Sequence, residues 1–207
     1  SGVPKFLPSF PGKLLENEIL NLKNLFLVKN ENEGVAVFGG SKISTKLHVL
    51  ESLANKVDKL ILGGGIANTF LAACGFNVGR SLYEKDFLES ARKIMKLTCV
   101  PLPSDVVTAK SFNKDAIAEE KVLSDIEDND IVMDVGPETR RYFGELIKEM
   151  NTTIWNGPLG VFEFPQFAKG TESIALAVAI WVDGRLKPPL LDPTVKHQTA
   201  DLESTAT

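Results

Sequence analysis

Short apolar runs alternate along the chain with longer segments in which apolar residues recur every three or four positions. The short runs are typical of buried strands, and the longer periodicity is typical of amphipathic helices. The predicted strands cover residues 35–38, 59–62, 99–102, 131–135 and 152–155. The predicted helices cover residues 13–27, 44–54, 66–73, 86–97 and 140–150. This alternation predicts an α/β fold: a parallel sheet flanked by helices, in a Rossmann-like three-layer sandwich.

The remaining segments set the expected domain limits. Residues 1–28 combine a connector with the first helix, and residues 110–130 form a charged surface excursion, after an extended path at 103–109. Residues 181–207 are polar and contain prolines but no clear periodicity, so we expect a divergent, disordered tail there. The predicted domain therefore covers residues 29–180.

Glycine-bearing loops follow four of the predicted strands. They begin at Gly39, Gly63, Gly136 and Gly157. Because the carboxyl ends of parallel strands meet at one edge of a sheet, we expect the four loops to converge there. Packing alone is a poor explanation for four such loops at one edge.

The first of these loops carries two lysines, Lys42 and Lys46. If a helix begins in this stretch, the two ammonium groups lie on one face of it, beside unpaired backbone N–H groups and the positive end of the helix dipole. That arrangement predicts a phosphate site. A tight turn with solvated lysines explains the stretch equally well by itself, because its spacing is not that of a P-loop.

Composition narrows the classes of partner. The 207 residues are 43% hydrophobic and carry a formal net charge of -4, which argues against a nucleic acid or an anionic membrane as partner. No apolar run approaches the roughly 20 residues of a membrane span. Cys74 and Cys99 indicate reduced thiols, so we expect a cytoplasmic protein. No His, Cys or acidic cluster has metal-ligand spacing, and we predict no metal held by the protein alone.

Four motifs together resemble the phosphoglycerate kinase family in their order and spacing. They are residues 39–46 (Gly-Gly-Ser-Lys-Ile-Ser-Thr-Lys), 63–65 (Gly-Gly-Gly), 134–139 (Asp-Val-Gly-Pro-Glu-Thr) and 155–163 (Trp-Asn-Gly-Pro-Leu-Gly-Val-Phe-Glu). The resemblance covers about residues 1–179 and is to the carboxyl-terminal, nucleotide-binding half of that enzyme. It implies binding of Mg-ATP or Mg-ADP, with the metal held mainly through the nucleotide.

The family resemblance also implies a reaction and its participants. Members are usually monomeric glycolytic enzymes that transfer a phosphoryl group between 1,3-bisphosphoglycerate with ADP and 3-phosphoglycerate with ATP. Lys42 matches the lysine that contacts the transferring phosphoryl group, which makes it the implied catalytic residue. Lys46 matches the lysine that holds the nucleotide phosphates. These roles suit phosphoryl transfer, which depends on positioning and on cations beside the equatorial oxygens.

The other implied nucleotide contacts come from the same loops. Gly40, Gly63 and Gly64 match backbone walls around the nucleotide, and Asn156 matches a side chain that touches its phosphates. The following loop implies contacts to sugar and base, through Gly157, Pro158, Val161 and the ribose-binding carboxylate Glu163. Ser41 stands where most members have alanine, a mild change beside a phosphate.

Two departures from the family pattern affect the expected activity. The chain lacks the half that binds 3-phosphoglycerate, and after Ala179 it does not continue into the family's loop with a metal-facing aspartate. We therefore expect the isolated chain to be inactive. The alternative is a truncated, non-catalytic module that binds adenine nucleotide. A dinucleotide-dependent oxidoreductase is disfavoured, because residues 63–65 lack the Gly-x-Gly-x-x-Gly spacing.

Overall fold

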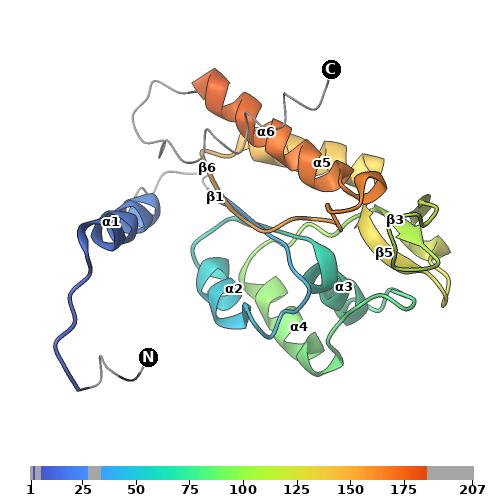
Figure 1. Ribbon diagram of the computed structural model, residues 1–207, viewed down its shortest axis with the longest axis horizontal. Coiled ribbons are helices and arrows are strands. Elements are labelled where there is room, and N and C mark those ends of the chain that lie inside the picture. Colours follow the sequence, from blue (N-terminus) through green and yellow to red (C-terminus); the bar gives the residue numbers. More distant parts are fainter. Residues whose placement is uncertain (1, 3–5, 28–33, 186–207) are drawn as a thin grey trace.

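The computed structural model describes residues 2, 6–27 and 34–185 (Figure 1). Its strands are β1 (Gly34–Phe38), β2 (Lys59–Leu62), β3 (Asp105–Ala109), β4 (Glu119–Val122), β5 (Ile131–Val135) and β6 (Thr152–Asn156). Its α-helices are α1 (Lys13–Leu27), α2 (Leu47–Ala54), α3 (Gly64–Ala73), α4 (Leu88–Leu97), α5 (Pro137–Glu149) and α6 (Lys169–Arg185). Among these described helices, none is long and apolar enough to cross a bilayer.

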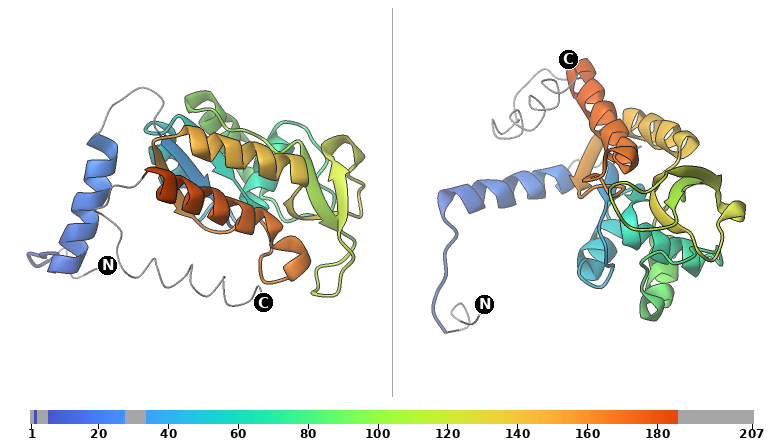
Figure 2. Two further views of the ribbon diagram at one scale, coloured as in Figure 1. Left: turned by 90° about the horizontal axis from the view of Figure 1, so that it is seen from above. Right: turned by 45° about the vertical axis from the view of Figure 1, so that its right-hand side comes forward.

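A parallel sheet with the strand order β2-β1-β6 lies at the centre of the fold. Because side chains alternate along a strand, Ala36 and Phe38 pack into one apolar cluster, with residues of α2, α3 and α4. Val35 and Val37 pack into another cluster on the opposite face, with residues of α5 and α6. The two groups of helices cover opposite sides of the sheet (Figure 1, Figure 2). The prediction of a parallel sheet inside a three-layer α/β sandwich is confirmed.

A second sheet, antiparallel and ordered β4-β3-β5, was not predicted. The sequence placed the strand at residues 131–135 in the parallel sheet, and that placement is wrong. β5 reads Ile-Val-Met-Asp-Val, and such a short, mostly apolar run cannot distinguish parallel from antiparallel pairing. The strand predicted at residues 99–102 is reduced to a bridge between Lys59 and Cys99, in a segment where Pro101 and Pro103 lack backbone donors.

Helices α1 and α6 lie at the two ends of the described chain. Helix α1 has the predicted bounds and lies to one side of the sheet, and its Leu14 and Leu15 are exposed (Figure 1). Helix α6 continues past residue 180 to Arg185. The rest of the predicted tail, residues 186–207, lies outside the described residues.

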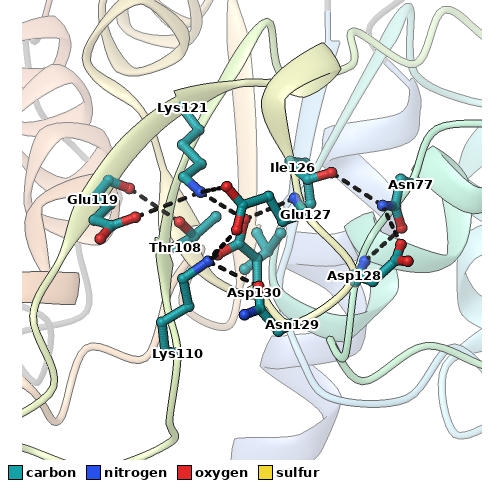
Figure 3. Close-up of polar contacts among 12 residues, drawn as sticks. Asn77, Thr108, Lys110, Glu119, Lys121, Ile126, Glu127, Asp128, Asn129 and Asp130 are labelled. Carbon is teal, nitrogen blue, oxygen red and sulfur yellow. Dashed lines mark hydrogen bonds and ion pairs between the residues drawn. The ribbon is translucent and has the colours of Figure 1, made fainter.

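An ionic cluster around the buried Asp130 joins the antiparallel sheet to the loop that precedes β5 (Figure 3). Asp130 is fully buried at the side chain, and its two carboxylate oxygens lie 2.8 Å from the ammonium groups of Lys110 and Lys121. Its Oδ2 also accepts a hydrogen bond from the backbone N–H of Glu127 at 2.8 Å. Burial opposes ionisation of Asp130, but the two lysines and this hydrogen bond outweigh it and lower its pKa to about 2.

We expect Asp130→Asn to lower the free energy of unfolding at pH 7 by about 1–3 kcal/mol, because charge-assisted hydrogen bonds are lost inside the protein. The unfolded carboxyl titrates near 3.8 and the folded one near 2. The contribution is therefore complete above about pH 5 and is lost progressively as the pH falls through the folded pKa towards about 1. Urea unfolding at several pH values measures the difference between the two proteins. The control is Asp115→Asn, an exposed position, and an equal loss in both variants would contradict the assignment.

Candidate functional site

Three of the glycine loops interlock through their backbones at the carboxyl edge of the parallel sheet. The N–H of Gly39 donates to the carbonyl of Asn156 at 3.0 Å, and that of Gly64 donates to the carbonyl of Leu159 at 2.8 Å. The carbonyl of Gly40 accepts from Ile66 N–H at 3.1 Å. The predicted site residues Gly40, Gly63, Gly64, Asn156, Gly157 and Pro158 are thus in three segments that meet.

Glycine is required at these contacts by the closeness of the chains. A Cβ on Gly39 would overlap the carbonyl of Pro158, and one on Gly63 would overlap the backbone of Leu159. Gly64 and Gly157 have φ values of +63° and +96°, which other residues rarely adopt. Gly39 and Gly63 are buried, whereas Gly64 and Gly157 are half-buried and leave backbone without side chains at the edge of the sheet.

The fourth loop does not join the other three, so the expectation of four converging loops is wrong. Gly136 follows β5, which belongs to the antiparallel sheet. The carboxylate of Asp105 lies at the N-terminus of α5, the helix that follows this loop. It accepts hydrogen bonds from the N–H groups of Glu138 and Thr139, at 3.0 and 2.8 Å. The first turn of α5 is thereby capped from inside the protein.

Lys46 lies at the meeting point of the three loops. Its ammonium group donates to the carbonyl of Gly39 at 2.8 Å and to the side-chain oxygen of Asn156 at 2.6 Å. It also lies 5.6 Å from the ring centre of Phe38, and burial lowers its pKa. Both oxygens that it contacts are neutral. Within the described chain no carboxylate pairs with Lys46, so its positive charge is not compensated by an ion pair.

Lys42 and Lys46 are not on one helix face, contrary to the expectation from their spacing. Residues 41–46 form turns, and α2 begins only at Leu47. Lys42 and Ser41 are exposed on this loop. The relative position of the two ammonium groups therefore depends on the loop conformation and not on helical periodicity.

Glu84 fixes that loop, and the sequence analysis missed it. Its carboxylate accepts hydrogen bonds from the N–H of Ser44 at 2.8 Å and from the hydroxyl of Ser44 at 2.6 Å. Burial opposes ionisation of Glu84, but these hydrogen bonds, one from Ile43 N–H and the charge of Lys42 outweigh it, so its pKa lies below the ordinary value. Glu84 is 40 residues from Ser44 in the sequence, and no local pattern indicates the contact.

The loop after β6 is held on both sides. Leu159 N–H donates to the hydroxyl of Thr171 at 3.1 Å, and Val161 N–H donates to the carbonyl of Met133 at 2.8 Å. Val161 is half-buried, whereas Glu163 is exposed. The structure thus places these two predicted contacts on one ordered loop, beyond the point where the three glycine segments meet.

Aromatic rings beside this loop were also missed. Phe164 packs against the same buried cluster as Val161. The ring of Phe112 is tilted against that of Phe164, with 5.5 Å between the ring centres. Phe112 is in the segment that the sequence identified only as a charged surface excursion. It is 63% exposed, which leaves an apolar ring at the surface beside the loop.

The acidic residues do not gather into a metal centre in the part of the chain that the structure describes. There, no group of three or more His, Cys, Asp or Glu side chains is placed to hold a metal ion.

We expect Gly63→Ala to destabilise the protein by about 1–3 kcal/mol, the usual cost of overpacking, because the new methyl group meets the backbone of Leu159. Gly144→Ala is the matched control. Its Cβ would have only an ordinary contact, with Ala177, and alanine in the interior of α5 should stabilise by about 0.5–1 kcal/mol. Thermal and urea unfolding measure both effects. A neutral Gly63→Ala would contradict the close backbone approach.

Comparison with known proteins agrees with this arrangement. The family model for phosphoglycerate kinase matches residues 1–184. The phosphoglycerate kinase of Coxiella burnetii superposes with a TM-score of 0.77 at 43% sequence identity, over 82% of this chain and 45% of the solved one. That of Pyrococcus horikoshii OT3 superposes with a TM-score of 0.67 at 27% identity, over 81% of this chain and 44% of the other. The chain thus spans less than half the length of these two structures, and it belongs to the phosphoglycerate kinase family.

Proposed function

We propose that this chain is the carboxyl-terminal, nucleotide-binding half of a phosphoglycerate kinase and binds Mg-ADP or Mg-ATP at the three glycine loops. The observation that carries the proposal is Lys46, held by two neutral oxygens where the loops meet. An ammonium group without an ion pair attracts a phosphate, and the surrounding glycine backbone allows a phosphate chain to approach closely.

Helix α3 adds to the same site. It begins at Gly64, its N-cap residue is Gly63, and no side chain caps its first turn. The positive end of its dipole therefore faces the glycine loops without a neighbouring carboxylate, an arrangement that favours a bound anion. Lys42 is exposed on the loop between β1 and α2. We propose that its side chain turns towards the terminal phosphate, which suits its proposed catalytic role.

The remaining contacts divide between sugar, base and metal. Pro158 and Val161 are proposed to cover the sugar and base, with Glu163 accepting hydrogen bonds from the ribose hydroxyls. Mg²⁺ is proposed to arrive on the nucleotide phosphates, since the described residues form no separate metal cluster. Bound in this way, the metal would neutralise phosphate charge during transfer.

For the whole protein we propose the glycolytic reaction of the family, phosphoryl transfer between 1,3-bisphosphoglycerate with ADP and 3-phosphoglycerate with ATP. A second candidate is an adenine-nucleotide-binding module without catalysis. It is favoured by one observation: the contacts of Lys46 with Gly39 and Asn156 suit the binding of a phosphate and do not require its transfer. Binding and turnover assays separate these two functions.

Titration with Mg-ADP tests the nucleotide site. We expect saturable binding and a rise in melting temperature, because a ligand of the folded state stabilises it. Lys46→Ala should weaken binding roughly 10- to 150-fold, since a charge-assisted hydrogen bond contributes about 1.5–3 kcal/mol. Lys93→Ala, on an exposed face of α4, is the control and should bind like the wild type. A folded wild-type chain that does not bind Mg-ADP would overturn the proposal.

Turnover tests the catalytic half of the proposal. We expect the purified 207-residue chain to bind Mg-ATP and yet to form no 1,3-bisphosphoglycerate from 3-phosphoglycerate in a coupled assay. The physical reason is that the proposed site holds only the nucleotide side of the transfer, and the acceptor must be oriented beside it. Turnover that disappears in Lys42→Ala would instead show that this chain carries the acceptor site as well.

A further inference from the structure

Asp134 is a buried carboxylate that the proposed nucleotide contacts do not include. It lies on β5 with 2% of its surface exposed, and its Oδ2 accepts a hydrogen bond from the N–H of Gly170 at 2.7 Å. Gly170 is the second residue of α6, so Asp134 caps this helix from a neighbouring strand. Asp134 is 36 residues from Gly170 in the sequence.

The same carboxylate packs against the loop that follows β6. A Cβ on Gly160 would overlap Asp134 Oδ1, and so would one on Gly170. Both positions therefore require glycine, because the carboxylate fills the space where a side chain would begin. Asp134 thus touches the loop on one side and the start of α6 on the other.

The residues on either side of Gly160 are held through the neighbours of Asp134. Val161 N–H donates to the carbonyl of Met133, which precedes Asp134 on β5. Leu159 N–H donates to the hydroxyl of Thr171, which follows Gly170 on α6. Any shift of α6 relative to β5 consequently moves Leu159 relative to Val161.

We propose that Asp134 is a positioning residue for the nucleotide, holding the loop of residues 159–161 and the first turn of α6 in the arrangement that presents Pro158 and Val161. The inference rests on the nucleotide site proposed above. Asp134 contacts the backbone of Gly160 and Gly170, so its role is to order the loop and not to touch the ligand.

The protonation of Asp134 supplies an additional readout. Burial raises its pKa to about 6, against hydrogen bonds from Gly170 and Val135 and the charge of Arg140 on α5. Glu172 on α6 raises the pKa further. Glu120 on β4 also faces this region, 3.8 Å from the guanidinium group of Arg140. Asp134 Oδ1 has no hydrogen-bond partner among the described residues and can carry the proton.

Asp134→Ala and Asp105→Ala form a matched pair for the test. Both remove a buried carboxylate that caps a helix, but Asp105 caps α5 and packs against Gly136, in the loop that does not join the other three. We expect both variants to lose stability. Only Asp134→Ala should weaken Mg-ADP binding, by about tenfold, and accelerate amide hydrogen exchange at Leu159 and Val161.

The exchange measurement distinguishes a failure of this inference from a failure of the proposed nucleotide site. If the wild type does not bind Mg-ADP, the proposed function fails, and exchange at Leu159 and Val161 still decides whether Asp134 orders the loop. Unchanged exchange in Asp134→Ala, or equal weakening of binding by both alanine variants, would overturn the inference.

Asp134→Asn covers the case in which the alanine variant does not fold, because the amide keeps an acceptor for Gly170 N–H. The folded carboxyl titrates near 6 and the unfolded one near 3.8. The wild type should therefore lose stability relative to Asp134→Asn as the pH rises from about 4 through the folded pKa to about 7, with no further change above that range. Parallel pH profiles of the two proteins, measured by urea unfolding, would contradict a buried carboxyl at this contact.

Discussion

The close approach of three backbone segments at one edge of the parallel sheet is the constraint on which the site depends. Gly39 lies against the carbonyl of Pro158, and Gly63 lies against the backbone of Leu159. Hydrogen bonds between the same segments fix β1, β2 and the loop after β6 relative to one another. Side chains would separate these segments, so their absence closes the sheet edge and leaves the half-buried Gly40 and Gly64 without side chains there.

Lys46 shows how this constraint produces chemistry. Its ammonium group can reach the Gly39 carbonyl and the Asn156 side chain only because β1 and β6 are adjacent and parallel. The two acceptors orient the charge without neutralising it. Orientation before binding reduces the entropy lost when an anion arrives, and the same contacts explain why Lys46 and Asn156 belong to one site despite 110 residues between them.

Structural features that depend on a local sequence pattern could be predicted from the sequence. Features that depend on contacts between distant segments could not. Strand–helix alternation and the glycine loops predicted the parallel sheet, and the motifs predicted the family; both are confirmed. The antiparallel pairing of β5 was missed because apolar runs do not encode direction. Glu84 and Asp134 were missed because their partners are 40 and 36 residues away. The nucleotide roles of Lys42, Val161 and Glu163 stay predictions.

Helix N-termini explain why an anion would select one place in this fold. Asp105 places a carboxylate at the N-terminus of α5, and Asp134 places one at the N-terminus of α6. The N-terminus of α3 has no side-chain cap and begins beside Gly40 and Lys46. Each capping carboxylate satisfies donors and places negative charge at the helix end, which repels a second anion. Of these three helices, only α3 has no carboxylate at its N-terminus, which is the charge distribution that the proposed phosphate site requires.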